Sequence, residues 1–85
     1  MAQQTQKIGE VTHYYTEIKV GTILLEKSLT VGDTIQIQGH TTDFTQEVDS
    51  IQFEHEAVET ATAGQEIGLK VEEKVRQGDE VFLVQ

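Results

Sequence analysis

This sequence has no cysteine, so the side chains best suited to catalysis or metal binding are those of its three histidines and fifteen acidic residues. Disulfides and thiolate metal sites are therefore excluded. His55 lies between Glu54 and Glu56, and on a strand the two glutamates would face one way and the histidine the other. His40 and Asp43 are spaced as in a turn whose side chains cap backbone amides. We therefore expect no metal site.

The hydroxyl side chains give no clear nucleophile. A serine or threonine nucleophile needs a base within hydrogen-bond reach, and neither Ser28 nor Ser50 lies in a G-x-S-x-G turn. Thr41 and Thr42 follow His40, but no orienting acid or oxyanion hole can be assigned to them. The sequence therefore predicts no catalytic residues, and we expect the chain not to be an enzyme.

A nucleotide site is not expected either. A P-loop has the pattern G-x-x-x-x-G-K-[ST], whose backbone N–H groups and lysine hold the phosphates. The pair Gly64 and Gly68 is followed by Leu69, so no lysine or hydroxyl stands in the required place. We expect no cofactor.

The charge balance restricts the partners. The 85 residues carry a formal net charge of −9, from 15 acidic and 6 basic residues. Such a field repels polyanions, and nucleic-acid binding depends on lysine and arginine displacing counterions from phosphates. We expect weak or no binding of free nucleic acid by this chain alone.

The sequence also predicts a location in the cell. Its first residues lack the basic start and apolar stretch of a signal peptide, and the longest apolar run, 81–84, is too short to span a bilayer. We expect a cytoplasmic protein with no membrane partner.

Alternating apolar residues predict strands at about 7–15, 17–25, 33–39, 43–54, 65–72 and 79–84. The fourth of these changes parity, with Phe44 and Val48 at even positions but Ile51 and Phe53 at odd ones. A one-residue insertion near 49–50 would place both sets on the core, so we expect a β-bulge there.

Glycine-centred turns precede three strands, at 31–33 (VGD), 63–65 (AGQ) and 77–79 (QGD). Glycine reaches the positive φ of tight turns without a steric clash. Closing six strands into a barrel would remove exposed sheet edges. We predict an all-β fold, a small closed six-stranded barrel at 7–85 after a disordered tail at 1–6.

Several segments together resemble the second domain of elongation factor Tu and of small elongation-factor-like proteins: 29–33 (LTVGD), 48–55 (VDSIQFEH), 58–61 (VETA), 63–69 (AGQEIGL) and 78–81 (GDEV). The resemblance runs from about residue 8 to 84. It implies a translation-factor β-barrel. In that family two residues of the fourth strand, one acidic and one basic, help to hold the aminoacylated end of tRNA, and they fall on Gln52 and His55 here.

Two functions follow from these observations. The first is a non-catalytic interaction module that docks on a protein or ribonucleoprotein, favoured by the small size and acidic surface. The alternative is a translation-linked RNA-binding barrel that contacts tRNA or the ribosome. In both, Gln52 and His55 are the candidate contact residues. The sequence leaves the partner and the oligomeric state open.

Overall fold

A computed structural model describes residues 5–84, in which strands and turns are the regular structure. The strands are β1 (Thr5–Tyr15), β2 (Val20–Leu25), β3 (Leu29–Thr30), β4 (Thr34–Gln38), β5 (Asp43–Glu47), β6 (Ile51–Phe53), β7 (Glu56–Val58), β8 (Thr60–Ala61), β9 (Glu66–Lys70) and β10 (Glu80–Val84). The all-β class is confirmed. No helix long and apolar enough to cross a membrane occurs in this range. Of the predicted tail, residues 1–4 lie outside the described residues, and Thr5 and Gln6 begin β1.

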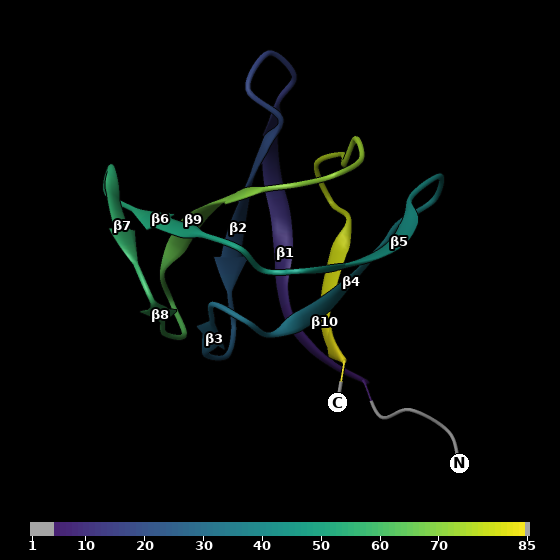
Figure 1. Cartoon of the computed structure of the whole chain (residues 1–85). Coiled ribbons are helices and arrows are strands. Elements are labelled where there is room, and N and C mark those ends of the chain that lie inside the picture. The colour runs from purple at the N-terminus through teal and green to yellow at the C-terminus, as the bar shows by residue number, and fades with distance from the viewer. Residues whose placement is uncertain (1–4, 85) are drawn as a thin grey trace.

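Eight strands form one antiparallel sheet in the order β5-β4-β10-β1-β2-β9-β6-β7, and β3 pairs with β8 separately. The end strands β5 and β7 are not hydrogen-bonded to each other, so the sheet is open. The predicted closed six-stranded barrel is therefore wrong. In Figure 1, β5 and the β6–β7 pair lie on opposite sides of the molecule, with β1 and β10 between them.

The sheet stays open because the segment 43–54, which was predicted as one strand, forms two separate strands. Its first part, β5, pairs with β4, and its second part, β6, pairs with β9 and β7. Residues 48–50 between them belong to no strand and cross from one side of the molecule to the other (Figure 1). The predicted bulge is thus wrong, although Val48 and Ile51 are both buried in the core as expected.

In a closed barrel, backbone hydrogen bonds would connect the edge strand β5 to the other side of the sheet. Here a side chain makes that connection. Gln46 of β5 is buried, and its Nε2 donates to the carbonyl of Lys70 at 2.9 Å. Its Oε1 accepts from the backbone N–H of Glu72 at 2.8 Å. One amide side chain therefore ties the edge strand β5 to the end of β9.

The predicted glycine turns are confirmed, and each is closed in the same way. Gly32, Gly64 and Gly78 have φ values of 100°, 89° and 95°, the left-handed region that glycine adopts without strain. In each turn the residue after the glycine bonds twice to the residue three positions before it. Its backbone N–H donates to the carbonyl of that earlier residue, and its side chain accepts that residue's N–H, as Asp79 does with Arg76. These turns fix the chain direction before β4, β9 and β10.

The bulges occur in β1 and not near residues 49–50. The register shifts between Lys7 and Gly9 against β10, and between Val11 and His13 against β2. Each extra residue bends the strand, so β1 can curve between its two neighbours. The second shift leaves Thr12 outside the backbone ladder, where its hydroxyl is available to other groups.

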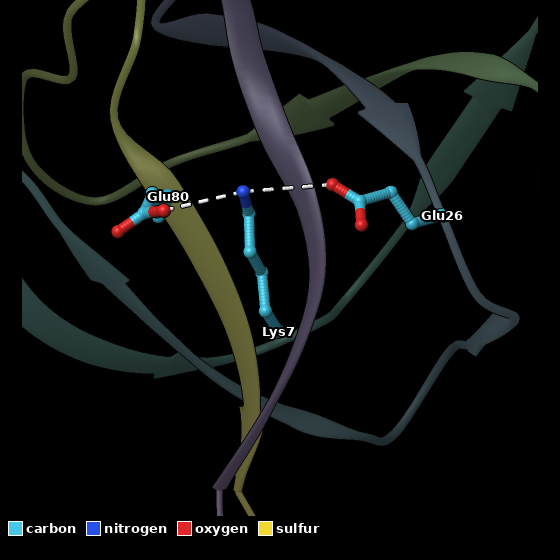
Figure 2. Close-up of polar contacts among 3 residues, drawn as sticks. All are labelled: Lys7, Glu26 and Glu80. Carbon is cyan, nitrogen blue, oxygen red and sulfur yellow. Dashed lines mark ion pairs between the residues drawn. The ribbon is translucent and has the colours of Figure 1, made fainter.

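Lys7 connects three segments at the surface (Figure 2). Its Nζ lies 3.2 Å from a carboxylate oxygen of Glu80 on β10 and 3.6 Å from one of Glu26, just after β2. The hydrogen bond to Glu80 is the main cause that raises the pKa of Lys7 above its ordinary value of 10.5, and the charge of Glu26 adds to it. The ammonium form is thus the form that the folded chain favours.

This ion pair predicts a loss of stability in alkali. A pKa that is raised on folding adds stability below the unfolded pKa, and that stability is lost as the pH rises through the folded value. We expect Lys7→Met to be less stable than the wild type at neutral pH, with the difference disappearing above about pH 10.5. Urea unfolding of both proteins across this range measures it, and a difference that is independent of pH would contradict it.

Candidate functional site

A hollow lined by both apolar and polar residues lies between the β1–β2 connection, the β6–β7 turn and β9. Its volume is about 570 Å³. We call it the hairpin groove, and its lining consists of Tyr15, Ile18, Val20, Thr22, Gln52, Glu54, His55, Glu66, Ile67 and Gly68. The β1–β2 connection projects from one end of the molecule (Figure 1).

One wall of the hairpin groove is apolar and exposed. The side chains of Tyr15 and Ile18 are 48% and 61% exposed, and Val20 is half-buried beside them. Isolated exposed hydrophobic residues are common, but several that line one hollow indicate a binding surface. The ring of His13 packs edge-on against that of Tyr15, with 4.4 Å between centroids, so the tyrosine ring is supported from behind.

The opposite rim is a turn in an unusual backbone conformation. Glu54 and His55 have φ values of 52° and 68°, a region that costs residues other than glycine roughly 1–3 kcal/mol each. Two such residues in succession are typical of a type I′ hairpin turn, where asparagine and glycine are preferred. Here the turn instead holds an acidic side chain and an imidazole at the edge of the groove.

The floor carries a carboxylate that is held in place by hydroxyl groups. An ionised glutamate only accepts hydrogen bonds, so Thr12 Oγ1 donates to Glu66 Oε2, at 2.7 Å. Thr22 Oγ1 lies 2.7 Å from Thr12 Oγ1; because the Thr12 proton is already committed, Thr22 donates to Thr12. This chain orients Glu66 on the groove floor.

The sequence-predicted candidates Gln52 and His55 come together in the hairpin groove, one on β6 and the other in the β6–β7 turn. Their role in contacting a partner stays a prediction. Of the two adjacent tyrosines, Tyr14 packs against the core and Tyr15 lines the groove. Ile18 was not predicted as a binding residue, although an isolated apolar residue among polar neighbours could have indicated one.

The histidines lie in separate places. His13 supports Tyr15 and His55 borders the hairpin groove, whereas His40 lines a different hollow of about 480 Å³. Within residues 5–84, histidine and acidic side chains form no group of three that could hold a metal ion. The expected capping role of Asp43 is replaced by a bond across two strands, in which its Oδ1 accepts from Gln36 Nε2 at 3.0 Å.

The strand arrangement has been seen before in solved structures. Two crystal structures of the C-terminal domain of a Geobacillus thermoleovorans protein, assigned as a U32 peptidase, superpose with a TM-score of 0.85. They are 22% identical in sequence and cover 89% of this chain, and the match covers 96% and 89% of the two solved chains. At this identity the likeness establishes the fold alone.

Sequence comparison leads to proteins with related names. The chain is 42% identical over 79 residues to an uncharacterized protease of Methanocaldococcus jannaschii, covering 92% of this chain and 19% of the relative. It is 37% identical over 82 residues to a collagenase of Porphyromonas gingivalis, covering 94% and 23% respectively. The chain thus spans about a fifth of the length of these relatives. No family model matches it.

These relatives correct three expectations. The resemblance to elongation factor Tu is wrong. The two functions built on it are wrong as well, both the non-catalytic interaction module that docks on a protein or ribonucleoprotein and the translation-linked RNA-binding barrel. The expectation that the chain is not an enzyme is contradicted too, because the relatives are named as proteases and collagenases. The segments that carried the resemblance, such as 63–69, form a glycine turn and the strand it begins, which the geometry of a curled sheet requires whatever its function.

Proposed function

We propose that this chain acts in proteolysis, as the part of a U32-type peptidase that binds the polypeptide substrate. The carrying observation is the hairpin groove, an open hollow with an exposed apolar wall and polar groups on its floor and rim. The names of the relatives support a peptidase context.

An extended polypeptide segment fits this surface chemically. Side chains of an unfolded segment would cover Tyr15 and Ile18, whose exposed apolar area is what association can remove from water. Peptide N–H and C=O groups of the same segment would both find partners in the side-chain amide of Gln52, which donates and accepts. The oxygen of Thr22, whose proton is given to Thr12, can accept from a peptide N–H. A groove of this kind suits a substrate that is recognised along a stretch of chain.

The experiment is a titration of the ¹⁵N-labelled chain with peptides from heat-denatured collagen, followed by NMR. We expect shifts confined to the groove residues. Burying an isoleucine contributes roughly 1.5–3 kcal/mol, so Ile18→Ser should weaken binding about tenfold, and Tyr15→Ser similarly. Both residues are exposed, so neither change should unfold the chain.

The matched control is Val31→Ser. Val31, in the turn before β4, is 37% exposed and does not line the groove. Equal losses of affinity for Val31→Ser and Ile18→Ser would show non-specific apolar binding and would refute the assignment of the groove. Absence of any binding would refute the proposed function itself.

A further inference from the structure

The charged groups of the hairpin groove are of one sign. Of the described residues that line it, Glu54 and Glu66 are acidic and none is lysine or arginine. The whole chain carries a net charge of −9, which adds a field of the same sign. A cationic ligand is therefore attracted to the groove, and an anionic one is repelled.

Glu66 gives the attraction of a cationic ligand a definite place in the groove. Glu66 is exposed, and one of its oxygens, Oε2, accepts from the Thr12 hydroxyl, which in turn lies 2.7 Å from the Thr22 hydroxyl. The second oxygen keeps its capacity to accept from a ligand. A carboxylate oriented in advance loses less freedom on binding than a free surface glutamate does.

The apolar wall beside this carboxylate suits a long cationic side chain. Lysine and arginine carry apolar stems that pack on hydrophobic surface while the charged head stays among polar groups. The Tyr15 ring, supported by His13, can also attract a cationic head through its face. Stem and head would then meet different parts of the same groove, the wall with Ile18 and the floor with Glu66.

We propose that the hairpin groove selects a basic residue, lysine or arginine, within the extended polypeptide that it binds. This inference rests on the proposed function and adds the substrate class. The stem lies along Tyr15 and Ile18, and the charged head pairs with Glu66. Glu54, on the strained rim, reinforces the negative field from the other side.

The test uses acetylated and amidated glycine–alanine peptides that differ at one central residue, which is arginine, norleucine or glutamate. Norleucine keeps an apolar stem without the charge. We expect the arginine peptide to bind about tenfold more tightly than the norleucine peptide by calorimetry, with the advantage shrinking as salt is added. The glutamate peptide should bind most weakly.

Variants separate the local carboxylate from the overall charge. Glu66→Gln should reduce arginine binding to the norleucine level. Thr12→Val, which frees the carboxylate from its hydroxyl partner, should lose part of the advantage. Glu47→Gln on β5 changes the net charge equally but lies outside the groove, so it should retain most of the arginine preference.

The possible outcomes test the preference for a basic residue separately from the polypeptide-binding function on which it rests. If the arginine and norleucine peptides bind equally well and Ile18→Ser weakens both, the preference for a basic residue is overturned and the polypeptide-binding function stands. An equal effect of Glu66→Gln and Glu47→Gln also overturns it, because the selectivity would then come from net charge alone. If no peptide binds, both are overturned.

Discussion

Gln46→Ala is expected to lower the free energy of unfolding by about 2–4 kcal/mol, because each backbone group left without its partner costs about 1–3 kcal/mol. The two groups are the carbonyl of Lys70 and the N–H of Glu72, which Gln46 bonds at 2.9 and 2.8 Å. At about 4–8 °C per kcal/mol for a domain of this size, the melting temperature should fall by about 8 °C or more. Thermal unfolding followed by circular dichroism measures it.

The control for this change is Gln38→Ala. Gln38 lies on the neighbouring strand β4 and is exposed, so its truncation should change stability by less than about 0.5 kcal/mol. Similar melting temperatures for the two variants would contradict the role of Gln46 as the link between β5 and the end of β9.

The second large effect is expected for Gly39→Ala. A Cβ on Gly39 would overlap the carboxylate of Asp79, which is 4% exposed and accepts the N–H of Arg76. The carboxylate must move and give up its bond, and overpacking at a buried site costs about 1–3 kcal/mol. We expect a loss of that size in urea unfolding.

A double-mutant cycle identifies the cause of this loss. Asp79→Gly removes the carboxylate, so Gly39→Ala should cost much less in that background, and the coupling between the two sites should be about 1 kcal/mol or more. Gly68→Ala is the control, since its Cβ would meet Val20 Cγ1 at an ordinary 3.5 Å. Additive effects in the cycle would show that the clash with Asp79 is not the reason.

The sequence predicted the longer strands and the glycine turns well, because both depend on local chemistry, but it missed the short strands β3, β7 and β8. Period-two alternation is a local signal, and Gly32, Gly64 and Gly78 each stand where a positive φ is required. Closure of the sheet was predicted wrongly because it depends on which strands pair with each other, and the paired strands can be far apart in the chain. Nothing local in 43–54 shows that its two halves pair with different strands, or that Gln46 replaces a ladder.

The candidate site was predicted only in part. Gln52 and His55 were singled out through a resemblance that proved wrong, yet both border the hairpin groove. The β6–β7 turn was missed because Glu54 and His55 lack the asparagine–glycine signal of such turns. Ile18 and Glu66 reach the groove from segments that are almost fifty residues apart, so only the folded sheet places them together.

The central place of β1 has a consequence for the synthesis of the protein. Its ladder partners are β2, which follows at once, and β10, the last strand, with Thr5 opposite Val84. A nascent chain leaving the ribosome at roughly 5–20 residues per second therefore exposes one side of β1 for seconds before β10 can emerge. Until then the unpaired edge is open to other chains, and a chaperone that covers it would protect the newly made protein from aggregation.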